Sequence, residues 1–337
     1  MTLTQRAEPH DPPESDALLS VRELHTEFLR EQAEPLRVVD GVSFDVERGK
    51  ALAIVGESGS GKSVTVRSVL RLLPRTARTP SGEAWFHGRD LLSLSQREMR
   101  RIRGRNIGMV FQNAAEAMNP TLTLERQLTE HLLWHGICGK SEARERAVRA
   151  LGDVGIPEPE RRIRVYPFQL SGGMRQRAMI AMAMVTEPAL LIADEPTTAV
   201  DVTVQRQILD LLVGLKDRGT GVIMITHDLG VARYFCDQAV VMYAGRVVEQ
   251  APTSELLDTP RHPYTKGLLG SSVEVGGQER PLLPIPGSPP DLAHRPAGCA
   301  FHPRCAQAES PRCQEEQELI SIGDERAAAC WKAETGR

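Results

Sequence analysis

Short apolar runs alternate with longer segments of helical periodicity along most of the chain. Buried strands are predicted by the apolar runs at 50–55, 107–111, 189–193 and 221–226, and less regular alternation predicts further strands at 38–46 and 81–87. Helices are predicted at 122–137, 141–155, 175–185 and 201–215, whereas 91–105 is an arginine-rich helix or loop. Strands that alternate with helices indicate an α/β fold with a largely parallel sheet.

A glycine-rich loop follows the strand at 50–55 and matches the pattern G-x-x-x-x-G-K-[ST]. Its residues are Gly56, Glu57, Ser58, Gly59, Ser60, Gly61, Lys62 and Ser63. Between a strand and a helix, such a loop cradles phosphates with its backbone N–H groups. The Lys62 ammonium would reach the outer phosphates and the Ser63 hydroxyl would bind Mg²⁺. The alternative is a plain strand-to-helix turn, and we expect the phosphate loop.

A second anion cradle is predicted at 170–177, where Ser171, Gly172 and Gly173 precede an alanine- and methionine-rich helix. A serine and two glycines at a helix N-terminus offer backbone donors to an anion. Because the chain already has one phosphate loop, we infer that this second cradle serves a partner chain.

Polar side chains follow three of the predicted strands. Gln112 follows 107–111, the pair Asp194 and Glu195 follows 189–193, and His227 follows 221–226. Each alone is typical of a solvated loop, but the carboxyl ends of parallel strands share one edge of a sheet, where ligands bind. We therefore assign Asp194, with Ser63 and Gln112, to Mg²⁺ and Glu195 to the attacking water. Gln112 and His227 are also assigned as catalytic groups.

Composition narrows the class of protein. The length of 337 residues indicates two to three folding units. A formal net charge of −3, with 25% charged, 41% apolar and 4% aromatic residues, disfavours a general nucleic-acid binder. The longest clear apolar run, 178–185, is too short to span a bilayer, so we expect a soluble or peripheral protein. Residues 1–17 lack a secretory signal pattern and are expected to be a disordered cytoplasmic tail.

Four cysteines, Cys299, Cys305, Cys313 and Cys330, lie in a proline- and alanine-rich segment near the C-terminus. Disulfides are disfavoured in a cytosolic chain, and the spacing lacks the short knuckles of most zinc sites. Four thiolates suffice for a [4Fe–4S] cluster, which we expect, with zinc and unliganded thiols as alternatives and His302 as a neighbour. A bound metal would be a structural staple for the segment or a redox switch.

The ordered motifs resemble those of an ATP-binding cassette (ABC) ATPase. They are the phosphate loop, the Q-loop Gln112, the signature 170–176, the Walker B pair Asp194 and Glu195, the D-loop 198–201 and the switch residue His227. The resemblance implies a P-loop (RecA-like) ATPase domain at 18–260 that contains a helical subdomain at about 113–185. A small cysteine-containing extension would follow at 261–337. ATP and Mg²⁺ are the implied cofactors.

The segments 243–249, 261–265 and 284–305 narrow the resemblance to the ATPase subunits of dipeptide/oligopeptide (peptide/nickel) importers. Relatives with this tail resemble iron–sulfur proteins. The resemblance implies a peripheral protein at the cytoplasmic face of the membrane. Its partners would be a second, related ABC ATPase in a heterodimer, two membrane permease subunits and an extracytoplasmic substrate-binding protein, without nucleic acid.

In such a dimer the signature binds the γ-phosphate of ATP held by the other subunit, with Asp201 beside it, and Phe28 is the candidate for stacking on adenine. The sequence departs from the usual pattern at 114–117 and at Val200, and neither change removes a reacting group. The transported substrate stays open between peptides, nickel and glutathione.

Two other classes compete with the importer. A redox-sensing ABC ATPase without transport stays open. A DNA-repair cassette is disfavoured, because only 108 positions (171 − 63) separate Ser63 from Ser171, without the sustained heptads of a coiled coil.

Overall fold

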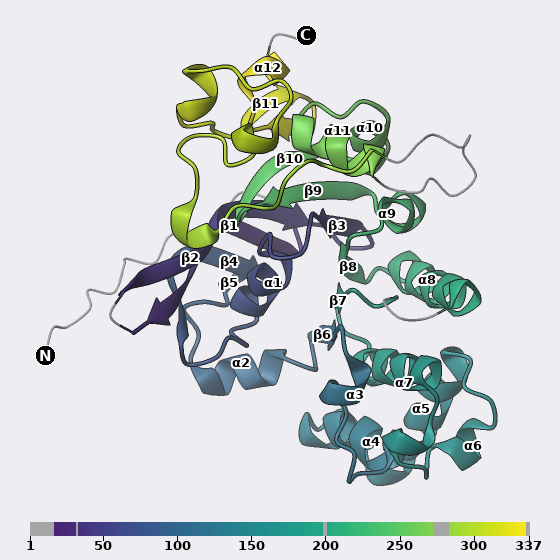
Figure 1. The fold of residues 1–337 in the computed structure, drawn as a ribbon. Coiled ribbons are helices and arrows are strands. Elements are labelled where there is room, and N and C mark those ends of the chain that lie inside the picture. Colours follow the sequence, from purple (N-terminus) through teal and green to yellow (C-terminus); the bar gives the residue numbers. More distant parts are fainter. Residues whose placement is uncertain (1–16, 32, 198–200, 272–282, 335–337) are drawn as a thin grey trace, which may run out of the picture.

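The computed structural model describes residues 17–31, 33–197, 201–271 and 283–334, whose strands form two sheets (Figure 1). The larger sheet has the strand order β11-β12-β10-β9-β3-β8-β7-β6, and the smaller one β2-β1-β4-β5. The strands are β1 Leu19–Arg30, β2 Ala33–Val46, β3 Ala51–Val55, β4 Ala77–Phe86, β5 Arg89–Asp90, β6 Ile107–Val110, β7 Leu190–Asp194, β8 Gly221–Thr226, β9 Gln238–Tyr243, β10 Arg246–Pro252, β11 Ile320–Gly323 and β12 Arg326–Ala328. The predicted α/β class is confirmed.

The centre of the larger sheet is parallel and buried on both faces. Strand β3 pairs in parallel with β8 and β9, and β7 pairs in parallel with β8 and β6. Alternate residues of β3 enter different cores: Ala53 packs among the helices, and Ile54 packs toward the smaller sheet. A strand buried on both faces needs a continuous apolar run, which is why the sequence predicted it.

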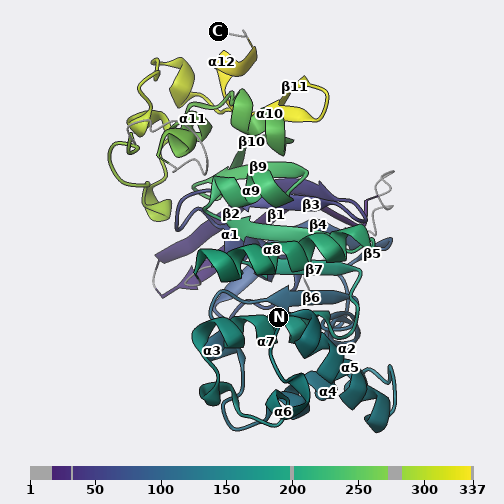
Figure 2. The ribbon, with the colours of Figure 1, turned by 90° about the vertical axis from the view of Figure 1, so that its right-hand side faces the viewer.

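The helices divide into those that flank the sheets and a separate helical layer. The flanking helices are α1 Lys62–Val69, α2 Gln96–Ile102, α8 Val202–Asp217, α9 Leu229–Phe235, α10 Thr253–Asp258 and α11 Pro263–Gly270. The helical layer, inserted between β6 and β7, contains α3 Ala114–Ala117, α4 Leu124–Trp134, α5 Lys140–Asp153, α6 Pro159–Arg162 and α7 Gly172–Met184. Figures 1 and 2 show this layer at one end of the molecule.

The C-terminal segment lies at the opposite end and rejoins the larger sheet (Figure 2). Strand β12 pairs antiparallel with β10, and α12 Trp331–Glu334 follows it. The ring of Phe301 lies 5.3 Å from the rings of both Tyr243 and Tyr264. The domain division at residue 260 stays a prediction, and these contacts tie the two parts together.

In the described part of the chain, no helix is both long and apolar enough to cross a membrane. Of the predicted disordered tail 1–17, residues 1–16 lie outside the described residues.

Candidate functional site

The predicted phosphate loop lies between β3 and α1 and is shaped by three glycines. Gly56, Gly59 and Gly61 have φ values of 151°, 80° and 101°, in the region that side chains disfavour. A Cβ on Gly56 would lie 2.3 Å from the carbonyl oxygen of Met242, whereas a Cβ on Gly59 would meet nothing within 4 Å. The loop is thus pressed against β9 on one side and open on the other.

The loop has groups that suit phosphate. The hydroxyl of Ser60 is buried and has no hydrogen-bond partner among the described residues. The Lys62 ammonium donates to the carbonyl oxygens of Gly56, at 2.7 Å, and Glu57, at 2.9 Å. Burial lowers the pKa of Lys62, and the carboxylates of Glu195, Asp194 and Glu57 oppose that shift. A buried cation and an unsatisfied hydroxyl beside an open cradle fit a triphosphate.

Two oxygen ligands for a hard cation stand together beside the loop. The Ser63 hydroxyl donates to Asp194 Oδ1 at 2.8 Å, and Asp194 is fully buried at the end of β7. Burial raises the pKa of Asp194, against the effect of Ser63 and of Arg67, whose Nη2 lies 3.4 Å from Asp194 Oδ2. A hydroxyl and a carboxylate are ligands that Mg²⁺ prefers. Sequence reasoning missed Arg67, although it follows Ser63 by one helical turn.

Glu195 receives groups from two neighbouring strands. Gln112 Nε2 donates to Glu195 Oε2 at 3.0 Å, and His227 Nδ1 lies 3.5 Å from Glu195 Oε1. The backbone of Glu195 has a φ of 49°, and its N–H donates to the carbonyl oxygen of Ile225 at 3.0 Å. The predicted convergence of Gln112, Glu195 and His227 is therefore present. The assignment of Gln112 to Mg²⁺ stays a prediction, because its amide donates to Glu195.

The structure does not bring the predicted signature to the phosphate loop of its own chain. Ser171 caps α7, its Oγ accepting from the Met174 N–H at 3.3 Å, and a Cβ on Gly172 would meet nothing within 4 Å. Figures 1 and 2 place α7 in the helical layer, away from α1. Ser171, Gly172 and Gly173 thus form a cradle separate from the first one.

The structure gives the positions of two other predicted nucleotide contacts, Asp201 and Phe28, but their contacts with nucleotide stay predictions. Asp201 caps α8 and accepts from the Val204 N–H at 2.9 Å, whereas residues 198–200 of the predicted D-loop lie outside the described residues. Phe28 is half-buried in β1 and pairs with Leu36 of β2. Strand β2 then reaches the loop, since a Cβ on Gly61 would lie 2.9 Å from the carbonyl oxygen of Val38. Phe28 as the adenine contact stays a prediction.

The predicted [4Fe–4S] cluster on Cys299, Cys305, Cys313 and Cys330 is wrong. The four side chains line one small pocket, but no group of three or more His, Cys, Asp or Glu residues in the described ranges is arranged to hold a metal ion. Burial raises the pKa of Cys299 to about 11 and also raises the pKa of Cys305 and Cys330. The zinc alternative fails on the same finding.

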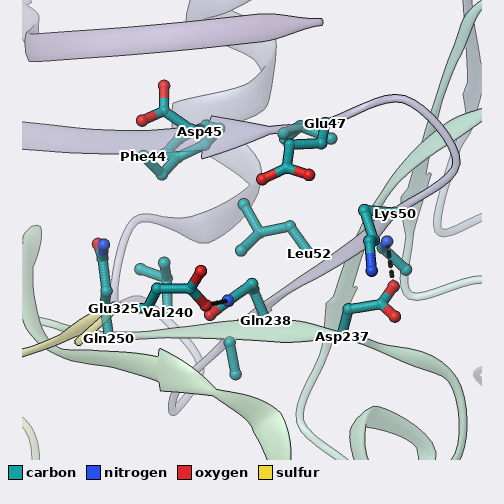
Figure 3. A pocket seen from close by; sticks show the side chains of 13 residues that line it. Phe44, Asp45, Glu47, Lys50, Leu52, Asp237, Gln238, Val240, Gln250 and Glu325 are labelled. Carbon is teal, nitrogen blue, oxygen red and sulfur yellow. Dashed lines mark hydrogen bonds between the residues drawn. The ribbon is translucent and has the colours of Figure 1, made fainter. Parts of the chain in front are cut away.

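A cavity of about 300 Å³ is lined by residues other than those of the phosphate loop, and Figure 3 shows its lining side chains. It is lined by Lys50 and Asp237 at the amino end of β3, opposite to the end that carries the phosphate loop. Some of its polar groups pair with each other: the Ala51 N–H donates to Asp237 Oδ2 at 2.7 Å, and Gln238 Nε2 donates to Glu325 Oε2 at 2.6 Å. The cavity brings together none of the predicted catalytic residues.

Comparison with protein families gives two matches. Residues 39–198 match the family described as ABC transporter, and residues 248–313 match the oligopeptide/dipeptide transporter C-terminal region. The second match contains Cys299, Cys305 and Cys313 and ends at the last of them.

The chain is also similar to whole proteins of known name. It is 50% identical to the probable peptide ABC transporter ATP-binding protein y4tR of Sinorhizobium fredii, over 95% of this chain and 96% of that protein. It is 45% identical to the oligopeptide transport ATP-binding protein OppD of Bacillus subtilis, over 93% and 88%. Among solved structures, a post-hydrolysis dimer of the ATP-binding cassette MJ0796 bound to ADP and Pi has a TM-score of 0.64 at 28% identity and covers 70% of this chain and 98% of that one.

Proposed function

Since the chain belongs to the oligopeptide/dipeptide family of ABC transporter ATP-binding proteins, we propose that it energises the import of peptides by hydrolysing ATP at the loop 56–63. The observation that carries the proposal is the meeting of three groups at the carboxyl edge of the sheet. Lys62 lies in the loop, Asp194 contacts the loop through Ser63, and Glu195 stands beside Asp194.

The residues of the site divide the chemistry between them. Lys62 and the N–H groups of the loop bind the phosphates, and Glu195 accepts the proton of the water that attacks the γ-phosphate. Gln112 and His227 hold the carboxylate of Glu195 from two sides and so orient it. Mg²⁺, held by Ser63 and Asp194, would neutralise phosphate charge.

The separate cradle at Ser171 supports a paired assembly. In this proposal Ser171, Gly172 and Gly173 bind the γ-phosphate of ATP held by a second cassette, because their own loop lies elsewhere in the chain. The second cassette is a related ATPase in a heterodimer, and two permease subunits and an extracytoplasmic binding protein complete the importer. The chain would then sit at the cytoplasmic face of the membrane.

Co-purification and transport test this function together. The chain, produced with its candidate permeases and second cassette, is expected to purify with them and to drive uptake of labelled peptide into proteoliposomes that depends on ATP. Active ATP hydrolysis without permease association would contradict the importer. Uptake of nickel or glutathione in place of peptide would contradict the substrate.

A further inference from the structure

Glu57 in the phosphate loop is held by the C-terminal segment. Its backbone N–H donates to the hydroxyl of Tyr264 in α11 at 2.8 Å, while its carbonyl oxygen accepts from the Lys62 ammonium. Its carboxylate accepts two hydrogen bonds from Arg304, at 2.7 Å from Nη1 to Oε2 and 3.1 Å from Nη2 to Oε1. A residue 247 positions away thus binds the second residue of the loop.

The arginine is held in place for this contact. The Arg304 side chain is only 6% exposed, its Nε donates to the carbonyl oxygen of Pro286 at 2.9 Å, and its Nη1 donates to the Tyr243 hydroxyl at 3.2 Å. Its guanidinium carbon lies 5.9 Å from the centres of the Tyr243 and Phe301 rings. The planar fork of arginine matches a carboxylate in a way that lysine cannot.

The aromatic residues under Arg304 belong to both parts of the chain. Tyr243 ends β9 of the core, Tyr264 lies in α11, and Phe301 lies between Cys299 and Cys305 in the tail. The Tyr243 and Tyr264 rings are 4.5 Å apart, and both tyrosines are almost fully buried. The fold of the tail therefore fixes where the guanidinium of Arg304 stands relative to the loop.

An acidic side chain in a phosphate loop works against the binding of a triphosphate unless its charge is neutralised. We propose that Arg304 is a positioning residue that neutralises Glu57, so that the C-terminal segment sets the affinity of the loop for ATP. This inference rests on the proposed function, because it requires ATP at the loop. Loss of Arg304 leaves the Glu57 carboxylate partly buried and uncompensated in the loop, where its charge already acts on the Lys62 ammonium.

The charge explanation is tested with four variants of the full chain: Arg304→Gln, Arg304→Lys, Glu57→Gln, and the double variant Arg304→Gln with Glu57→Gln. The matched control is Arg312→Gln, another tail arginine, which stacks on the ring of Trp331 instead. Affinity for ATP and the KM and kcat of hydrolysis are measured at low and high salt, and thermal unfolding checks that each variant is folded.

Arg304→Gln is expected to weaken ATP binding roughly tenfold to thirtyfold, the size of one uncompensated charge acting through an effective dielectric constant of about 20. KM should rise with little change in kcat, and added salt should reduce the defect. Arg304→Lys keeps the charge but loses the two-point contact with Glu57, so its affinity for ATP should fall between those of Arg304→Gln and the wild type. The double variant removes both charges and should recover most of the affinity.

Two results would overturn the inference: Arg304→Gln binding ATP like the control, or the double variant binding no better than Arg304→Gln. The second result would mean that Arg304 only stabilises the fold and does not act by neutralising Glu57. If the wild-type chain itself binds no ATP, the proposed function fails instead, so the two failures are distinguishable.

Discussion

Replacement of Glu195 by glutamine separates the contribution of Glu195 to proton transfer from its effect on ATP binding. Glutamine has the shape of glutamate and keeps an oxygen that can accept the hydrogen bond from Gln112 Nε2. In the wild-type structure this bond to Glu195 Oε2 is 3.0 Å long. It cannot accept a proton from water at neutral pH. The expected result is a folded protein that binds ATP and hydrolyses it poorly.

The magnitude follows from the role of Glu195. Loss of a general base costs about 10²- to 10⁴-fold in rate, or about 3 to 5 kcal/mol in the activation barrier. Binding should not weaken, because Glu195 is one of the charges that raise the pKa of neighbouring Asp194, and its removal relieves repulsion beside the phosphates. A slow turnover with equal or tighter ATP binding is therefore the expected signature.

Single-turnover hydrolysis of labelled ATP, together with equilibrium binding, measures both quantities. Glu187→Gln is the matched control, since Glu187 has a similar backbone φ of 53° and lies in the turn after α7, where its N–H donates to the carbonyl oxygen of Met184. Lys62→Ala should instead fail at nucleotide binding. Hydrolysis by Glu195→Gln at the wild-type rate would refute its assignment as the base.

Three further predictions concern stability and thiol chemistry. Burial opposes the charge of Asp40, yet Arg246 and Arg295, each at 2.6 Å, hold its pKa below the ordinary value. Asp40→Asn should therefore lower the free energy of unfolding by about 2 to 4 kcal/mol in urea titrations, and an unchanged midpoint would contradict the pairing. Burial lowers the pKa of His262 to about 3, so the unfolded chain binds its proton first and the stability that neutral His262 contributes falls as the pH drops from 6.5 toward 3. In His262→Asn that loss, about 1.4 kcal/mol per pH unit, should disappear from the stability profile, and parallel profiles would contradict it. The Cys299 thiol, with its pKa near 11, should be alkylated slowly at pH 7 and about tenfold faster per pH unit up to pH 10, as followed by mass spectrometry. Fast alkylation at pH 7 would contradict the raised pKa.

The sequence predicted the parallel core because local rules govern it. The strand β8 has the predicted bounds 221–226. In the phosphate loop, glycine stands at the three positions where the backbone has a positive φ, Gly56, Gly59 and Gly61. The smaller sheet was harder to predict, since register shifts interrupt the pairing of β1 with β2 and blur its alternation. Its pattern is therefore visible in the structure and weak in the sequence.

The contacts that were missed connect distant parts of the chain. Arg304 and Glu57 are 247 residues apart, and no local pattern pairs one arginine with one glutamate over that distance. The cluster prediction failed for a related reason. Cysteine spacing gives the number of ligands, whereas the arrangement of the four side chains depends on packing with distant residues such as His262, which lines the same pocket.

The central claim is that this cassette completes the ATP site of a second one through Ser171. Ser171→Arg would put a bulky side chain into the cradle at the start of α7, far from Lys62 in the same chain. The decisive measurement is photo-crosslinking of labelled ATP, with hydrolysis followed separately on each subunit of the assembled pair. The account predicts normal ATP binding by the Ser171→Arg chain and loss of hydrolysis at the phosphate loop of its partner. Unchanged hydrolysis at the partner's loop would contradict it.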